Sequence, residues 1–330
     1  MSRDAPRHSR HSRQLAVALL VVTLACSGDE TPTLPPPPAE PTGTLLLRDP
    51  SGILFTLAAG TAETPREISR FGDRLNGSES SLLPGGTSVV GMGVARNGIP
   101  RGLRRFDLAE GGELTVLAEL DELTFVFGTR TSPDGQVIAF AASNWVPGRI
   151  TLMQMDLSTR EVEQLWTAAG TDDEQSFSRF HWLPDRSALI GQLWGLDRSA
   201  PIDQPLAFNR FRLARFDMAT RTMTTFSDWM VADMVSPTIE LSRDGRTIVY
   251  NGQDGILRFV TLDGTPAPGF PTDLRGILPA FSPDGKLLAY SKLRDGIAGI
   301  NGVFIYRFSD GATWRLLPEG SPLEEVLDWE

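Results

Sequence analysis

The chain has 330 residues, 41% of them hydrophobic and 22% charged, which are the proportions of an ordinary soluble domain. Its net charge of −10 is opposite in sign to that of general nucleic-acid binders, and it excludes nucleic acid as an expected partner. Cys26 is the only cysteine, so the chain can form no internal disulfide and its stability has to come from packing.

Residues 1–25 have the organisation of an export signal. Arginines between residues 3 and 13 precede an apolar stretch, 15–25, that is too short to cross a bilayer. The stretch ends in Thr23-Leu24-Ala25-Cys26, which resembles the lipobox of bacterial lipoproteins. The resemblance implies that Cys26 carries lipid and anchors the protein outside the cytoplasm, in the bacterial cell envelope. The alternative is an ordinary secretory signal with an incidental cysteine.

A proline-rich segment follows the cysteine, within residues 26–43. Prolines at this density favour an extended polyproline helix, which can hold a domain up to ~50 Å from a membrane. We interpret the segment as a tether; a ligand for SH3-like domains is the alternative. The remaining residues, 44–330, have the length of one folded domain.

A four-residue phrase recurs through this domain. Its copies are Leu83-Pro84-Gly85-Gly86, Ser132-Pro133-Asp134-Gly135, Leu183-Pro184-Asp185-Arg186, Ser242-Arg243-Asp244-Gly245 and Ser282-Pro283-Asp284-Gly285. Successive copies lie 40 to 59 residues apart, and each precedes an apolar run. A repeat near the length of one propeller blade, roughly 40–50 residues, indicates a radial architecture.

The phrase has the chemistry of a tight turn. Proline presets φ, aspartate accepts hydrogen bonds from the backbone ahead of it, and glycine tolerates positive φ. The flanking runs are too short for helices and are rich in β-branched and aromatic residues. A second marker containing aspartate, as at Asp156 and Asp217, ends a third strand, and a short fourth strand follows. Each unit is therefore predicted to be a four-stranded antiparallel blade.

One unit carries a clear resemblance to a known family. The run Phe281-Ser282-Pro283-Asp284-Gly285-Lys286-Leu287-Leu288-Ala289-Tyr290-Ser291 resembles the WD-repeat-like unit of TolB-type β-propellers, and the similarity covers about residues 44–330. The resemblance implies an all-β propeller. It says little about function, because such propellers serve as scaffolds, binding modules and substrate-gating domains.

The two ends of the domain are incomplete units that complement each other. Residues 44–49, 53–58 and 66–68 have the pattern of strands two to four, and 325–330 that of a first strand. Pairing them closes the ring without an open sheet edge, and gives about six blades.

Few residues of the domain suggest catalysis. His181 is the only histidine after residue 25, and we expect it to pack or to line the channel rather than to bind a metal. The sequence contains no nucleophile elbow and no phosphate-binding glycine loop. The aspartates of the phrase are expected to form turns. No catalytic residue, cofactor or metal site is therefore predicted, with a divalent cation on the acidic channel mouth as the alternative.

The partner-binding face is predicted from loop lengths. Loops between strands two and three vary from minimal to the long segment 192–210, and they lie opposite the phrase turns. Acidic connections between blades on the same face suggest a cationic segment in the partner. The candidate residues are Trp145, Arg149, Asp172, Asp173, Trp194, Asp197 and Arg198. Each tryptophan could instead pack on a neighbouring loop.

Three functions remain open on this basis. The leading hypothesis is a lipid-anchored, monomeric propeller that binds an envelope protein or peptide without chemistry of its own. The second is an extracytoplasmic enzyme, a lyase or glycan hydrolase, that uses carboxylates of the channel. The third is a sensor ectodomain or an assembly subunit.

Overall fold

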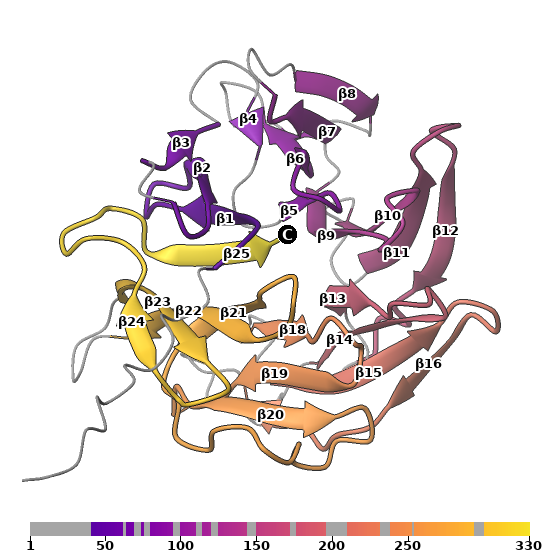
Figure 1. Ribbon diagram of the computed structural model, residues 1–330. Coiled ribbons are helices and arrows are strands. Elements are labelled where there is room, and N and C mark those ends of the chain that lie inside the picture. Colours follow the sequence, from indigo (N-terminus) through magenta and orange to yellow (C-terminus); the bar gives the residue numbers. More distant parts are fainter. Residues whose placement is uncertain are drawn as a thin grey trace, which may run out of the picture. The chain divides into compact units, whose positions relative to one another are not determined.

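The computed structural model describes residues 41–61, 64–68, 74–75, 80–94, 100–109, 114–119, 125–143, 150–171, 176–195, 210–231, 238–252, 254–293 and 300–330. The regular elements of these residues are all β-strands. They include no helix that is long and apolar enough to cross a membrane. The residues from Glu40 onwards belong to one compact unit, in which six antiparallel sheets form a ring around a central axis (Figure 1).

Each sheet is one blade, with its strands in meander order from the axis outwards. The ring-closing blade contains β25 (Glu325–Trp329), β1 (Thr44–Arg48), β2 (Leu54–Ala58) and β3 (Arg66–Glu67). The second blade contains β4 (Arg74–Leu75), β5 (Ser81–Leu82), β6 (Ser88–Val94), β7 (Pro100–Asp107) and β8 (Leu114–Ala118). The third contains β9 (Phe125–Thr131), β10 (Val137–Ser143), β11 (Ile150–Asp156) and β12 (Val162–Thr167).

The other three blades follow the same order. The fourth contains β13 (Ser176–Trp182), β14 (Ala188–Gly195), β15 (Arg210–Asp217) and β16 (Thr222–Thr225), with β17 (Met230–Val231) pairing with β15. The fifth contains β18 (Ile239–Leu241), β19 (Thr247–Asn251) and β20 (Leu257–Thr261). The sixth contains β21 (Ile277–Phe281), β22 (Leu287–Leu293), β23 (Ile300–Arg307) and β24 (Thr313–Arg315).

The ring closes as the sequence predicts. β25 pairs antiparallel with β1, so that Trp329 lies opposite Leu45 and Glu325 opposite Arg48. The innermost strands contact each other all the way round, from β5 through β9, β13, β18 and β21 to β25, which in turn contacts β5. The C-terminal end of the chain therefore lies at the middle of the ring (Figure 1).

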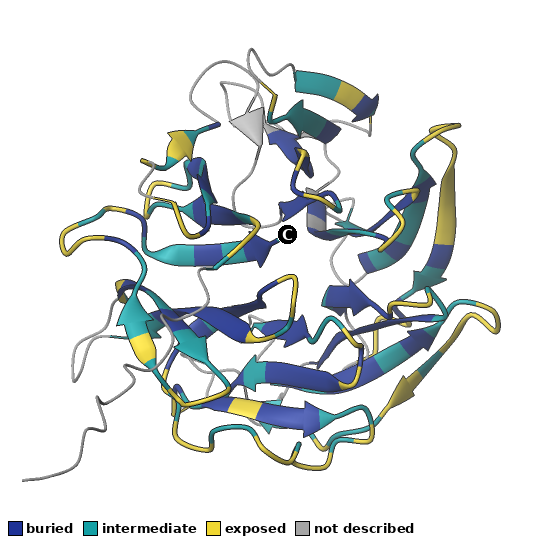
Figure 2. Cartoon of the chain, in the orientation of Figure 1, coloured by how far each residue is buried: buried dark blue, intermediate teal, exposed yellow. Residues whose placement is uncertain are grey.

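The hydrophobic core consists of six clusters, one at each junction between neighbouring blades. Within the second strand of a blade, alternate residues belong to different clusters. In β10, Ile138 and Phe140 face the second blade, whereas Ala139 faces the fourth. Because second strands are buried on both faces, they read as continuous apolar runs in the sequence. Figure 2 shows this burial concentrated in the inner strands, with exposed residues in turns and outer strands.

The phrase turns repeat one hydrogen-bond network. In the third blade, Ser132 Oγ donates to Asp134 Oδ1 at 2.6 Å and accepts from Val137 N at 2.9 Å. Gly135 has a φ of 70°, which glycine adopts without strain. The same bonds recur around Ser242 and Ser282. The aspartates are therefore turn residues, as predicted.

The degenerate phrase of the fourth blade places Arg186 where the others have glycine. Arg186 adopts a φ of 61°, and its guanidinium pairs with Asp134 of the neighbouring turn. The second markers also end their strands as predicted. Asp217 Oδ1, for example, accepts from Ala219 N at 3.1 Å and Thr220 N at 2.9 Å.

The outer edge of the fifth blade differs from the predicted pattern of four regular strands. A single bridge joins Val260 to Pro266, and Ala267 N donates to Phe259 O at 2.9 Å. Pro266 and Pro268 have no N–H, so this segment cannot form a continuous ladder. Phe270 packs on Phe259 instead, with ring centroids 4.7 Å apart.

Candidate binding channel

The axis of the ring is lined by a belt of six residues at equivalent positions. We define the belt as the residues two positions before each phrase, Ser81, Arg130, His181, Glu240 and Ala280, together with Asp328 of β25. Asp328 is equivalent because Glu330 N donates to Thr44 O, as Ser132 N does to Val137 O. All belt residues except Ala280 line one cavity. The repeat therefore brings three ionisable acids and bases and one arginine to the same level of the channel.

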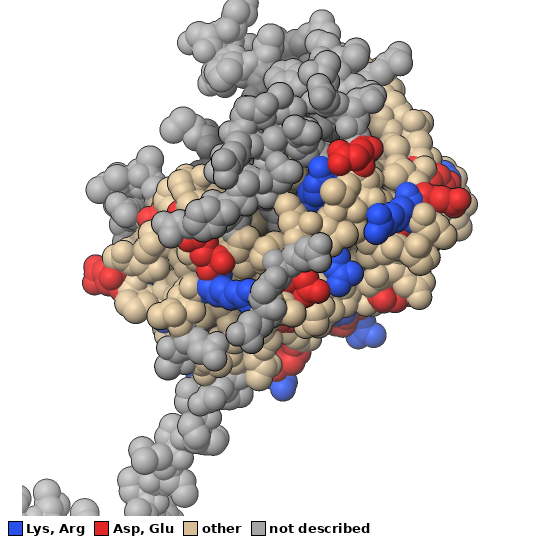
Figure 3. Space-filling model, turned by 90° about the horizontal axis from the view of Figure 1, so that it is seen from above, with Lys and Arg blue, Asp and Glu red and all other residues tan. Residues whose placement is uncertain are grey.

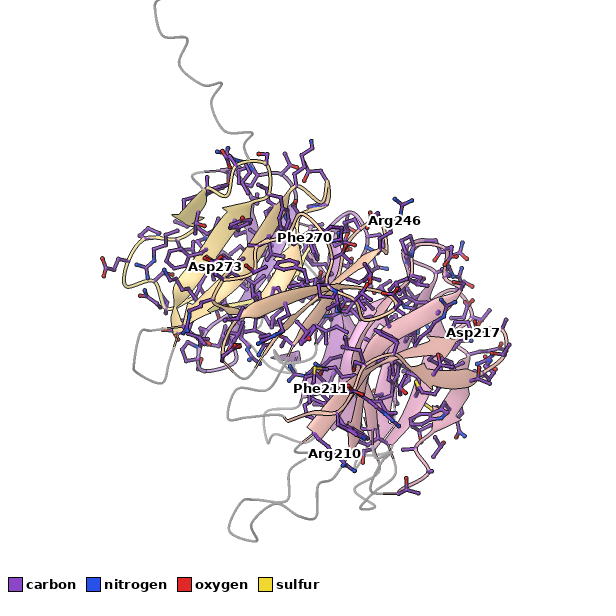
Figure 4. The ribbon with its side chains drawn as sticks, turned by 90° about the horizontal axis from the view of Figure 1, so that it is seen from below. Arg210, Phe211, Asp217, Arg246, Phe270 and Asp273 are labelled. Carbon is purple, nitrogen blue, oxygen red and sulfur yellow. The ribbon has the colours of Figure 1, made fainter. Side chains whose placement is uncertain are left out.

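Two cavities occupy the channel and share Arg130 and Glu240. The turn-side cavity, of about 170 Å³, is also lined by Pro84, Pro133 and Pro184 of the phrases. The loop-side cavity, of about 90 Å³, is lined by residues near the starts of the inner strands, such as Ser80 and Thr238. Figure 4 shows the two faces on the blades: Arg246, directly after a phrase, and Arg210, at the start of β15, lie at opposite ends.

Bulges in the inner strands shape the loop-side cavity. Pairing with the second strand shifts register between Ser178 and His181, and between Ile277 and Ala280. Gly128, Arg179 and Leu278 occupy equivalent positions with φ of 58°, 50° and 52°, and all three line this cavity. Positive φ is unfavourable for arginine and leucine, and such strain persists only where the surrounding structure imposes it. The inner strands are thus bent where they face the channel.

The turn-side cavity has an apolar part and a polar part. Three phrases contribute proline, and Trp182 lies beside them. In the fifth blade the phrase has Arg243 instead, whose Nη1 lies 2.6 Å from Glu330 Oε1. A second nitrogen of Arg243 donates to the carbonyl oxygen of Trp329. Arg243 therefore links the fifth blade to the closing strand at the channel mouth.

The acidic residues of β25 have structural partners. Asp328 is buried, and its two oxygens accept from Leu82 N and Trp329 N, each at 2.9 Å. Burial, assisted by the negative charge of Asp328, raises the pKa of Glu330 to about 6, although Arg243 opposes this shift. Both carboxylates thus hold the closing strand to its neighbours.

Glu240 and His181 form a buried neutral pair. His181 Nε2 lies 3.0 Å from Ile239 O and 3.4 Å from Glu240 Oε2. Because a carbonyl oxygen only accepts, Nε2 carries the proton. Burial raises the pKa of Glu240 to about 8, and burial together with the nearby Arg130 lowers the pKa of His181 well below its usual 6.5. At neutral pH both side chains are uncharged.

Arg130 is a charged belt residue without an ion pair in the described part of the chain. Its Nη1 donates to the adjacent Thr129 O at 3.0 Å, and its buried Nε has no hydrogen-bond partner in the described part of the chain. Its own carbonyl accepts from Trp182 Nε1 at 3.1 Å. Arg130 therefore places a positive charge in the channel without an ion pair to a described carboxylate.

The structure tests few of the predicted site residues. Cys26, Trp145, Arg149, Asp172, Asp173, Asp197 and Arg198 lie outside the described residues. Trp194 is inside them: it is buried, with its ring centroid 5.5 Å from that of Phe211, so it packs on the neighbouring strand β15, whereas the alternative had it packing on a loop. The long loop expected at 192–210 begins later, because Leu193 and Trp194 continue β14 into the core. His181 lines the channel, as predicted.

The belt was not predicted, although its signal is present in the sequence. Aligning the phrases and reading two positions upstream finds Ser81, Arg130, His181, Glu240 and Ala280, a position that varies in charge from blade to blade. Among the residues that the structure describes, no three His, Cys, Asp or Glu side chains are grouped so as to hold a metal ion.

The outer surface shows no comparable grouping in the described residues that Figure 3 draws, where acidic and basic side chains are interspersed. Surface pairs such as Arg221 with Glu163 and Arg258 with Asp254 are largely exposed. Each such pair contributes about 0–1 kcal/mol, so these charges say little about a binding face.

No family model matches the sequence, and no curated protein matches it. Solved structures do match. TolB from Acinetobacter baumannii has a TM-score of 0.60 at 22% identity, covering 88% of this chain and 67% of that chain. The fold is that of a TolB-type β-propeller.

Two further structures share the propeller. A chain of a nidogen/laminin complex has a TM-score of 0.57 at 13% identity, covering 87% of this chain and 97% of that chain. Hydrazine synthase from Kuenenia stuttgartiensis has a TM-score of 0.53 at 12% identity, covering 80% of each chain. Because proteins with such different names share this fold, the function has to be argued from the channel.

Proposed function

We propose that this TolB-type propeller is a non-catalytic scaffold that binds a segment of another envelope protein at its axial channel. The observation that carries the proposal is the state of the channel carboxylates. Asp328 and Glu330 are engaged in holding β25, and Glu240 is buried and neutral. The loop-side cavity, with Arg130 and Glu240 in its wall, suits recognition of a side chain inserted from the loop face.

The scaffold is held at the membrane through Cys26, in this proposal. Attachment of two or three acyl chains is sufficient for stable anchoring, whereas one chain is marginal. Replacing Cys26 with serine should release the protein into the soluble fraction or block its processing. Mass spectrometry of the wild-type N-terminus checks the same point, and an unmodified cysteine or cleavage elsewhere would contradict it.

The proposed partner binds on the loop face. The test replaces residues 196–209 with a short Gly-Ser turn, leaving β14 and β15 intact so that Leu193 and Trp194 stay in the core. Capture of a partner from detergent-solubilised envelope should be lost, while the unfolding transition stays unchanged. The matched control is Lys286→Ala on the turn face, where the lysine side chain is 76% exposed. Loss of capture in the control alone would place the partner on the turn face.

A specific observation favours the enzyme as the second candidate. The raised pKa of Glu240 is a property of general acids in glycan-cleaving enzymes. Turnover of an envelope glycan by the wild-type protein that is abolished in Glu240→Gln would favour catalysis. Partner capture by Glu240→Gln at the wild-type level, with no turnover by either protein, favours the scaffold.

A further inference from the structure

Three arginines line the loop-side cavity, and they differ in their partners. Arg48 pairs with Glu325 of the same blade. Arg179 also has an interaction partner in the protein. Arg130 donates one hydrogen bond to Thr129 O, and no described carboxylate pairs with it. A guanidinium has five N–H donors, and a partly buried one that lacks a counter-ion is costly.

None of the described neighbouring acids forms an ion pair with Arg130. Asp328 accepts two backbone N–H groups, and Glu330 pairs with Arg243. Glu240, the only acid that lines the loop-side cavity among its described residues, is protonated because burial raises its pKa to about 8. The loop-side cavity therefore has a positive charge available, whereas the turn-side cavity has both Asp328 and Glu330 in its wall.

We propose that the loop-side cavity is a carboxylate-binding site, in which Arg130 pairs with a carboxylate inserted from the loop face and the neutral Glu240 donates a hydrogen bond. The cavity of about 90 Å³ has room for such a group. This inference rests on the proposed scaffold function and names the chemistry of the inserted group. It also changes the expected partner: the acidic connections predicted from the sequence favoured a cationic segment, whereas the inner lining favours an acidic side chain.

Ionisation of Glu240 should abolish this site. The charged and titratable groups around Glu240 are Arg130 of β9, His181 of β13, Arg243 after β18, and Asp328 and Glu330 at the end of the chain. Once ionised, Glu240 pairs with Arg130 and repels an incoming carboxylate. Affinity should therefore fall roughly ten-fold from pH 7 to pH 9, because about a tenth of a group remains protonated one unit above its pKa.

The site can be tested on the full chain by NMR titration with three probes: acetate, the capped tripeptide Gly-Asp-Gly and the capped tripeptide Gly-Asn-Gly. The indole N–H of Trp182 is a local reporter, since it donates to the carbonyl of Arg130. Acetate and the aspartate peptide should shift this signal, and the asparagine peptide should not. Tighter binding of the aspartate peptide than of acetate identifies a protein segment as the source; equal binding identifies a free carboxylate.

Two variants and a control complete the experiment. Arg130→Gln should weaken carboxylate binding by about ten-fold or more. Arg130→Lys should weaken it by less, because lysine keeps the positive charge but cannot form the bidentate pair of hydrogen bonds that a guanidinium forms. Arg215→Gln is the control, since Arg215 lies on β15 near Asp217 and lines neither cavity. Glu240→Gln should keep its affinity from pH 7 to pH 9, which a purely structural role of Glu240 does not explain.

Equal binding of the aspartate and asparagine peptides, or wild-type affinity in Arg130→Gln, would overturn the carboxylate site. Neither result bears on the scaffold proposal, which is tested by partner capture. Conversely, carboxylate binding in a protein that captures no partner would refute the scaffold and leave the site intact.

Discussion

In five of the six blades the belt residue lies two positions before the phrase turn, and the turn is repeated from blade to blade whereas the belt residue varies. Three blades build the same bonds between the serine hydroxyl, the aspartate and the backbone. The belt, by contrast, holds serine, arginine, histidine, glutamate, alanine and aspartate. A turn needs particular φ angles and acceptors, whereas a belt side chain points into a space that any residue can enter. If the channel binds a partner as we propose, the belt is where the repeat leaves room for specificity.

The closing blade sharpens this comparison, because it has a belt residue, Asp328, and no phrase turn after it. In the other blades a turn connects the first strand to the second, whereas β25 and β1 are held together by strand pairing and side-chain contacts. Trp329 is fully buried between the sixth and closing blades, and its Nε1 donates to Thr42 O at 2.8 Å. Trp329→Ala should lower the free energy of unfolding by about 3–5 kcal/mol, measured by chemical denaturation. Trp314→Ala in the half-buried outer strand β24 is the control; equal losses would show that closure has no special dependence on Trp329.

The belt should also give stability a characteristic pH dependence. Glu240 has a folded pKa of about 8 against 4.5 for the ordinary carboxyl, so the unfolded chain releases this proton first and stability falls as pH rises through that window. The lowered pKa of His181 has the opposite sign and acts only below pH 6.5. Glu330, with a pKa of about 6, adds to the fall only below pH 6.

Between pH 6.5 and 8, Glu240 is therefore the belt residue that contributes most to the pH dependence of stability. The expected loss is about 2 kcal/mol, at roughly 1.4 kcal/mol per pH unit. Denaturation curves of the wild type and Glu240→Gln at both pH values check this, and the variant should lose the slope. The idea fails if the two proteins have parallel pH profiles.

The contrast between turn and belt also explains what the sequence could predict. The phrase, its spacing and the incomplete ends predicted the six blades and the pairing of β25 with β1, because turns and apolar runs are local signals. The neutral state of Glu240 and the lack of an ion pair at Arg130 depend on residues from different blades. Because these residues are far apart in the chain, no local pattern in the sequence predicts the two properties. Trp194 shows a different limit: it was expected on a loop, but it lies at the end of a strand and is buried in the core.

The turn network should be less costly to break than the closing blade. Ser132→Ala removes the acceptor of the buried Val137 N–H and the donor to Asp134, and should cost about 1–2 kcal/mol. Ser158→Ala is the matched control, because its hydroxyl bonds to Asp156 on an exposed turn. Thermal unfolding of both variants distinguishes them. A loss at Ser132 no larger than that at Ser158 would mean that the repeated bonds are incidental.

The smallest effect is expected at Arg186, where a phrase departs from its own pattern. Its φ of 61° costs arginine or alanine about 1 kcal/mol and costs glycine little. Arg186→Ala and Arg186→Gly both lose the pair with Asp134, so their difference isolates the backbone. The glycine variant should be more stable than the alanine variant by about 0.5 kcal/mol, because the relief of about 1 kcal/mol of strain is offset by about 0.5 kcal/mol for the added freedom of the unfolded chain. At the neighbouring Arg246, which has no positive φ, the order should reverse, because only the entropic cost of glycine remains. Alanine more stable than glycine at both positions would show that the fourth blade does not require the turn geometry of the phrase at Arg186.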